Sequence, residues 1–197
     1  MSKWEGPGSM PNNKNNKEAV VFGITGGSGV GKSYVTRLFM DYNAYIIDAD
    51  KVGHQVLADK TKEVVAVFGE SILSAQDNTV IDRKKLGALV FSDKKNLKHL
   101  NKIVHPYIVQ EIFARVLDNK KYYDIIVIDA ALLFDLKINI ICDLTILVHA
   151  DEEIKIKRIM ERDKIEEIRA RDRINSQRDF LELEPLVDIV VMNNNSE

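Results

Sequence analysis

Residues 25–34 read T-G-G-S-G-V-G-K-S-Y and directly follow the apolar run A-V-V-F-G-I at 19–24. Four glycines fall within six residues, and a lysine and a serine come straight after them. Residues 26–33 match the pattern G-x-x-x-x-G-K-[ST], with a strand-like run before it and helical spacing of apolar residues after it. The stretch therefore predicts a phosphate-binding loop between a strand and a helix.

The residue types in this loop explain why it should bind a nucleoside triphosphate. Glycines allow a close approach, so that backbone N–H groups can surround a phosphate. Lys32 can reach the β- and γ-phosphates, and Ser33 can bind Mg²⁺. A flexible linker is also rich in glycine, but it would not place Lys-Ser at this offset between a strand and a helix. We expect the nucleotide to contact Gly26, Gly27, Ser28, Gly29, Val30, Gly31, Lys32, Ser33 and Tyr34.

The composition excludes several classes of protein. With 197 residues, of which 45% are hydrophobic, the chain can bury a single core. A net charge of −2 gives no sign of a nucleic-acid partner, and no apolar run or leader suggests a membrane. The single cysteine, Cys142, cannot form an internal disulfide, which fits the reducing cytoplasm where we expect the protein. The sequence does not indicate an oligomeric state.

Residues 1–17 resemble an added tag and a disordered polar tail, which leaves one domain at 18–197. Apolar runs recur there with helical segments between them, which predicts an α/β fold with a mainly parallel sheet. Runs without alternation suit strands that are covered on both faces. The five expected strands lie near 19–24, 44–48, 124–129, 143–148 and 187–192. They define a core of 18–50, 121–150 and 179–197.

The chain between the second and third strands is too long for one crossover helix, so 51–120 should be a helical insertion. We expect helices at 52–68, ending at Gly69, and at 96–104, with a further helix that begins at Pro106.

A second helical segment, 151–178, is rich in arginine and could be a lid that closes over a triphosphate. We expect its arginines to repel one another until a polyphosphate neutralises them. A solvated pair of charged helices would have the same composition, and this alternative stays open.

Four kinds of nucleotide-binding protein contain a loop of this type. A small-molecule kinase needs a carboxylate on the acceptor side, and Asp48 and Asp50 follow the second strand, although either could cap a helix. A regulatory GTPase needs N-K-x-D, and N-K-K-Y at 119–122 lacks the aspartate. A motor ATPase needs an acidic pair, but Asp129 is followed by A-A-L-L. A non-catalytic module leaves the insertion and the lid unexplained. The kinase is therefore favoured.

Further motifs narrow the kinase to one family. They are G-I-T-G-G-S-G-V-G-K-S, I-I-D-A-D, I-D-R-x-x-L-G-x-x-V-F, V-H-P, I-D-A-A-L-L-F-D, R-I-x-x-Q and V-D-I-V-V-M-N-N. Their order and spacing over 19–195 resemble the dephospho-CoA kinase family. The resemblance implies a P-loop kinase fold with an acceptor-binding insertion and a lid. It also implies transfer of the ATP γ-phosphate to the ribose 3′-hydroxyl of dephospho-CoA, with Mg²⁺, in the last step of coenzyme A synthesis. Another P-loop small-molecule kinase is the alternative.

The resemblance also assigns roles to residues. Asp50 would be the base near the acceptor hydroxyl, Lys32 the γ-phosphate ligand and Arg162 the lid arginine. Asp48 would support the turn or a Mg²⁺-bound water. The remaining acceptor-side residues would be Arg83, His105, Leu132 and Leu133, of which Arg83 could equally be a surface residue and His105 a helix cap.

The sequence departs from the family pattern at four positions. Ala131 replaces the usual proline, Asp135 a glutamate, Tyr34 a small residue and Met192 an acidic residue. None of these changes removes a group needed for phosphate chemistry, but Tyr34 adds bulk near the nucleotide. The family also continues past position 197 into a closing helix.

Overall fold

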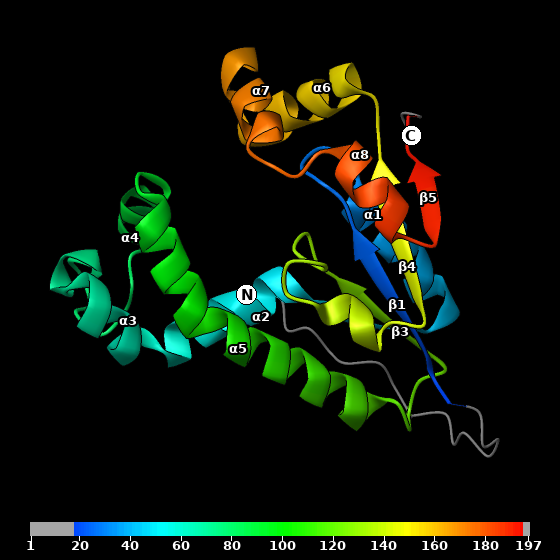
Figure 1. The fold of residues 1–197 in the computed structure, drawn as a ribbon, viewed down its shortest axis with the longest axis horizontal. Coiled ribbons are helices and arrows are strands. Elements are labelled where there is room, and N and C mark those ends of the chain that lie inside the picture. The colour runs from blue at the N-terminus through cyan, green and yellow to red at the C-terminus, as the bar shows by residue number, and fades with distance from the viewer. Residues whose placement is uncertain (1–17, 195–197) are drawn as a thin grey trace. The chain divides into compact units, whose positions relative to one another are not determined.

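The computed structural model describes residues 18–194 of the chain (Figure 1). The expected tag and tail at 1–17 lie outside this range. Contacts divide residues 18–194 into two units, 18–47 with 115–194 and 48–114. The second unit nearly coincides with the helical insertion expected at 51–120.

The first unit is built on a sheet whose strands, within residues 18–194, follow the order β2-β3-β1-β4-β5 (Figure 1). β1 pairs in parallel with both β3 and β4, and β4 pairs in parallel with β5. The strands are β1 Val20–Thr25, β2 Tyr45–Asp48, β3 Ile125–Asp129, β4 Leu144–His149 and β5 Ile189–Met192. Each begins and ends within two residues of its predicted position, so the mainly parallel α/β sheet is confirmed.

The central strands are buried because helices and loops cover both of their faces. On one side, Ile24, Val127 and Val148 pack with Val35 of helix α1 (Lys32–Leu38). Elsewhere on β1, a Cβ added to Gly23 would lie 2.8 Å from the Cys142 sulfur. Cys142 is half-buried, and burial raises the pKa of its thiol to about 12, so the thiol form is favoured near neutral pH.

The second unit is helical, but its helix boundaries differ from those predicted. Its elements are α2 Ala49–Asp59, α3 Thr61–Phe68, the 3₁₀ helix η2 Glu70–Ile72, α4 Arg83–Phe91 and most of α5 Lys94–Asn119. The single helix predicted at 52–68 is wrong, because the chain leaves helical geometry at Lys60 (φ −99°, ψ 19°). There the Thr61 hydroxyl donates to the carbonyl of Ala58 at the end of α2. Gly69, with φ 80°, follows the last residue of α3, as predicted.

The prediction that Pro106 begins a new helix is also wrong, since Pro106 lies inside α5. Proline has no N–H to donate and normally interrupts a helix. Here the apolar residues continue at helical spacing on both sides of it, and Val104, Ile108, Ile112 and Val116 are all buried. Packing of this apolar face outweighs the missing hydrogen bond.

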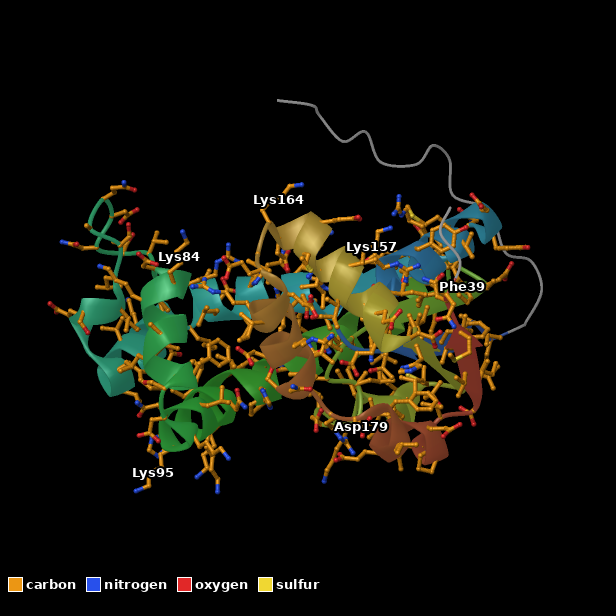
Figure 2. The ribbon with its side chains drawn as sticks, turned by 90° about the horizontal axis from the view of Figure 1, so that it is seen from above. Phe39, Lys84, Lys95, Lys157, Lys164 and Asp179 are labelled. Atoms are coloured by element: carbon orange, nitrogen blue, oxygen red, sulfur yellow. The ribbon has the colours of Figure 1, made fainter. Side chains whose placement is uncertain are left out.

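The predicted lid segment is a helical pair in the first unit, α6 Glu152–Asp163 and α7 Glu167–Asn175. The two helices pack through Ile156, Ile159 and Ala170. Figure 2 shows Lys157 and Lys164 pointing away from this pair. A short helix, α8 (Phe180–Leu183), and the 3₁₀ helix η4 (Glu184–Leu186) then lead into β5. Two further 3₁₀ helices are η1 Phe39–Tyr42 and η3 Ile138–Ile141.

No helix between residues 18 and 194 is both long and apolar enough to cross a bilayer.

β5 is held in register by a carboxylate that lies just before it. Asp188 Oδ2 accepts hydrogen bonds from the Thr145 N–H and hydroxyl, each at 2.7 Å. Both hydrogen bonds lower the pKa of Asp188, and the bond from the Thr145 hydroxyl has the larger effect. Asp143 plays a similar part for β1, since its Oδ2 accepts from the N–H of Val21 at 2.7 Å.

We expect Asp188→Asn to lower the thermal unfolding midpoint at pH 7, because a neutral amide accepts these hydrogen bonds less strongly. The folded-state pKa of Asp188 lies below its unfolded value of about 4, so its contribution is fully present above that value. It is lost as the pH falls through the folded-state pKa. The difference between wild type and variant, measured by thermal unfolding, should therefore shrink in acid. Asp41→Asn, at an exposed position of η1, is the control, and a difference that does not change with pH would contradict this role.

Candidate active site

The loop between β1 and α1 has the backbone geometry of a phosphate-binding loop. Gly29 and Gly31 adopt positive φ angles of 78° and 84°, which residues with a side chain rarely adopt. Both glycines are also crowded, since a Cβ on Gly29 would lie 2.6 Å from the Lys155 carbonyl oxygen. A Cβ on Gly31 would collide with the side chain of Asn193. Conformation and space therefore both require the glycines that the sequence pattern contains.

Carbonyl groups of this loop find donors on α6 and just after β5. Asn193 Nδ2 donates to the Val30 oxygen at 2.9 Å. Arg158 Nη1 lies 3.4 Å from the oxygens of both Gly29 and Val30, and it donates to the Asn193 oxygen at 3.0 Å. Because these carbonyl oxygens already accept hydrogen bonds from side chains, the N–H groups of the loop can bind an anion.

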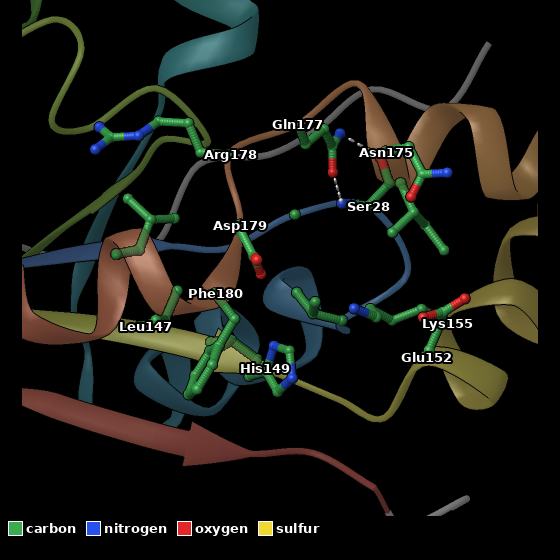
Figure 3. Close-up of a pocket in the computed structure, with 15 residues that line it drawn as sticks. Ser28, Leu147, His149, Glu152, Lys155, Asn175, Gln177, Arg178, Asp179 and Phe180 are labelled. Atoms are coloured by element: carbon green, nitrogen blue, oxygen red, sulfur yellow. Dashed lines mark hydrogen bonds between the residues drawn. The ribbon is translucent and has the colours of Figure 1, made fainter.

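The start of the loop contacts the segment that follows the lid helices. Ser28 N–H donates to Gln177 Oε1 at 2.7 Å, and Gln177 Nε2 donates to Ser28 Oγ at 3.0 Å (Figure 3). Sequence reasoning assigned no role to Gln177 or Asn193, and it counted Arg158 only among the lid arginines that could contact phosphate. The available signals were the Q of R-I-x-x-Q and the first N of the N-N pair after the last strand.

Lys32 is held by a carboxylate at the end of β3. Its ammonium group forms an ion pair with Asp129 Oδ1, and the Thr36 hydroxyl donates to Asp129 Oδ2 at 3.0 Å. The side chains of Lys32 and Asp129 are only 15% and 12% exposed, so solvent screens this pair little. The carboxylate therefore neutralises the lysine that we expect to bind the γ-phosphate.

The oxygen atoms around the loop are suited to bind Mg²⁺ together with a nucleotide. Ser33, exposed in the first turn of α1, and Asp129 offer the oxygen ligands that Mg²⁺ prefers. Within residues 18–194, no group of three or more His, Cys, Asp or Glu side chains could hold a metal ion by itself. A Mg²⁺ ion at this loop would therefore need phosphate oxygens to complete its coordination.

The expectation that the lid arginines repel one another is wrong, because the helices supply acidic partners. Arg162 Nε and Nη2 each donate to Asp163 at 2.9 Å, and Arg173 Nη1 donates to the same carboxylate at 2.6 Å. The hydrogen bond from Arg162 is the main cause of a lowered pKa at Asp163. Arg171 likewise pairs with Glu152 and Glu167.

The two aspartates after β2 have different surroundings. Asp48 caps α2, since its Oδ1 accepts from the Lys51 N–H at 3.0 Å, which confirms the capping alternative. Asp50 lies exposed in the first turn of α2.

Arg83 and His105 both belong to the second unit but differ in exposure. Arg83, the first residue of α4, is exposed and lines a 420 Å³ pocket. The other residues around this pocket are His54, Leu57, Ala58, Thr61, Thr79, Val80 and Ile81. His105 is half-buried within α5, so the alternative that it caps a helix is wrong.

The two leucines predicted to contact substrate lie in the first unit and are not equivalent. Leu132 is 49% exposed, whereas Leu133 is fully buried. A Cβ on Gly23 would lie 2.8 Å from a Leu133 methyl carbon, so Leu133 packs against β1. Leu133 is therefore a core residue in this structure, and its contact with substrate stays a prediction.

A 310 Å³ cavity borders the loop on the side of Gln177. One wall is His149, whose ring lies 4.1 Å from that of Phe180, centroid to centroid. Figure 3 shows Lys155 and Glu152 on the opposite side of this cavity. Burial is the main cause of a lowered pKa at His149. The stack fixes the start of α8 against the end of β4.

A family model described as dephospho-CoA kinase matches residues 20–197. The chain belongs to the dephospho-CoA kinase family. The resemblance seen in the sequence motifs is thereby confirmed.

Individual relatives agree over most of the chain. A dephospho-CoA kinase of Oceanobacillus iheyensis is 35% identical over 182 residues, which cover 90% of each chain. One from Arabidopsis thaliana is 37% identical over 89% of this chain and 77% of its own. The crystal structure of TT1252 from Thermus thermophilus superposes with a TM-score of 0.80 at 27% identity, covering 91% of each chain. The dephospho-CoA kinase from Campylobacter jejuni gives 0.60 at 28% identity, covering 89% of each. The P-loop kinase fold is confirmed.

We expect Lys32→Ala to lower phosphate-transfer turnover by about 10²- to 10³-fold, because this charge must stabilise the transferring phosphoryl group. The variant also leaves Asp129 without its ion pair, which should cost about 1–3 kcal/mol of folding stability. The double variant Lys32→Ala/Asp129→Asn should regain stability but not turnover. Calorimetry and steady-state kinetics measure the two effects separately, and near wild-type turnover in Lys32→Ala would remove the assignment of this loop.

Proposed function

We propose that this protein transfers the γ-phosphate of ATP to the ribose 3′-hydroxyl of dephospho-CoA, the last step of coenzyme A synthesis. The observation that supports this most directly is the phosphate-binding loop with its Lys32–Asp129 ion pair, in a chain of the dephospho-CoA kinase family. Relatives of this chain are named dephospho-CoA kinase, which supports dephospho-CoA as the phosphate acceptor.

The residues of the loop would hold the triphosphate. Loop N–H groups bind its phosphates, and Lys32 exchanges the Asp129 carboxylate for the γ-phosphate. Mg²⁺, held by Ser33 and phosphate oxygens, would neutralise charge on the β- and γ-phosphates. Arg162 would leave Asp163 and bind phosphate when the lid closes. Arg162 is 56% exposed, so solvent already weakens its pairing with Asp163.

Asp50 would act as the general base. A ribose hydroxyl is a weak nucleophile, and a carboxylate within hydrogen-bonding reach can orient it and accept its proton. Asp50 suits this role because it is exposed, whereas Asp48 is engaged in capping α2. In open α/β sheets, ligands bind at the carboxyl ends of the strands, and Asp50 follows the end of β2 by two residues.

The 420 Å³ pocket of the second unit would take part of the acceptor. It combines apolar walls, including Leu57 and Val80, with the cationic side chain of Arg83. Dephospho-CoA has a diphosphate and a pantetheine arm with methyl and methylene groups between its amides, so the cation and the apolar walls can each contact part of the molecule.

A cytoplasmic location is also proposed. The half-buried thiol of Cys142 and the absence of any second cysteine from the sequence suit a reducing compartment.

Asp50→Asn should leave ATP affinity within a few-fold of wild type while turnover falls by about 10²-fold or more, because an amide cannot accept the proton. Asp48→Asn is the matched control, since asparagine caps helices as well as aspartate does. Steady-state kinetics and calorimetric titration with ATP would measure both effects. Loss of turnover in Asp48→Asn with retention in Asp50→Asn would exchange the two roles.

Arg83→Met should raise the KM for dephospho-CoA by about tenfold, the equivalent of one charge-assisted hydrogen bond, with little change in the KM for ATP. Lys84→Met is the control, because Lys84 neighbours Arg83 on α4 but is not among the residues that line the 420 Å³ pocket. His105→Asn is expected to behave like Arg83→Met if His105 touches the acceptor. An equal rise in both KM values would instead indicate a packing role for the substituted residue.

A further inference from the structure

The carboxamide of Gln177 contacts Ser28 with both of its polar atoms. Its oxygen accepts from the Ser28 N–H at 2.7 Å, and its nitrogen donates to the Ser28 hydroxyl at 3.0 Å. The two residues are 149 positions apart in sequence. Two bonds from one planar group fix orientation as well as distance. Gln177 therefore restrains the first half of the phosphate-binding loop.

The loop is shaped to receive this side chain. A Cβ added to Gly27 would lie 2.6 Å from Gln177 Oε1, so the glycine before Ser28 leaves room for the carboxamide. This requirement comes from space and not from a left-handed backbone, since Gly27 is absent from the positive-φ glycines among residues 18–194.

Gln177 also lies between a lid helix and a fixed point. α7 ends at Asn175, and the Gln177 N–H donates to the Ile174 carbonyl in its last turn at 3.1 Å. Three residues further on, the ring of Phe180 stacks on His149 at the end of β4. A displacement of α7 would therefore pull on Gln177, while the segment beyond it stays anchored.

We propose that Gln177 is a positioning residue for ATP, which holds Ser28 and thereby links the position of the lid to the order of the phosphate-binding loop. This inference deepens the proposed function and rests on it for the identity of the acceptor. Because Gln177 acts on the loop and not on the acceptor, its loss should weaken the interaction with ATP alone.

The test compares Gln177→Met, Ser28→Ala and the double variant. Methionine keeps an unbranched side chain of similar length but removes both hydrogen bonds, whereas Ser28→Ala removes only the bond to the hydroxyl. Gln76→Met, a change of the same type at an exposed position in the second unit, is the control. The readouts are amide hydrogen exchange over 26–31 in the free protein, the Kd for Mg-ATP by calorimetry, both KM values and the thermal midpoint.

Gln177→Met should speed exchange at the Ser28 amide and raise the Kd and KM for ATP by about tenfold, with the KM for dephospho-CoA and the thermal midpoint nearly unchanged. The double variant should be no worse than Gln177→Met, because the same contact is already lost. Unchanged exchange and ATP affinity would overturn the proposal. So would additive effects of the two substitutions, or a parallel rise in both KM values with a lower midpoint.

Failure of the proposed function would look different. In that case wild-type protein would fail to phosphorylate dephospho-CoA, and the exchange comparison would still decide whether Gln177 orders the loop.

Discussion

A loop that binds phosphate through its N–H groups must find other donors for its carbonyl groups, and this constraint organises the first unit. The protein meets it with Asn193 and Arg158, which donate to the carbonyls of Gly29 and Val30. An unpaired, partly buried carbonyl would cost about as much as a lost hydrogen bond, so these contacts stabilise the loop before a ligand arrives. The site is thus partly pre-formed, which lowers the entropy lost on binding.

The cationic groups expected to bind phosphate are neutralised in the free protein. Asp129 pairs with Lys32, and Asp163 pairs with both Arg162 and Arg173. A triphosphate must replace these carboxylates, so its affinity reflects the difference between two sets of charge-assisted hydrogen bonds. The Asp129 carboxylate at Lys32 is harder for a phosphate to replace than the Asp163 carboxylate at Arg162, because the first ion pair is largely buried and solvent screens the second.

Local patterns predicted most of the fold, whereas contacts between distant segments could not be predicted. The β-branched runs gave the strands, and the glycine pattern gave the loop, because each signal lies within a few residues. The helix boundary predicted at Pro106 was wrong, because α5 continues past this proline with a buried face that depends on tertiary packing. Leu133 belonged to a motif that resembled a substrate-binding segment, but only the structure showed its burial. The partners of the loop carbonyls come from α6 and from beyond β5, and no local pattern connects them to the loop.

The bond between Asn193 and Val30 joins positions 163 residues apart. On the ribosome, a chain is made from its N-terminus, so the glycine-rich loop emerges long before the side chain that fixes it. Contacts of such long sequence separation also form late because closing the intervening chain costs entropy. A nascent chain that has already built β1 would therefore lack a finished nucleotide site until β5 joins the sheet. Competence to bind nucleotide would thus mark the completion of folding.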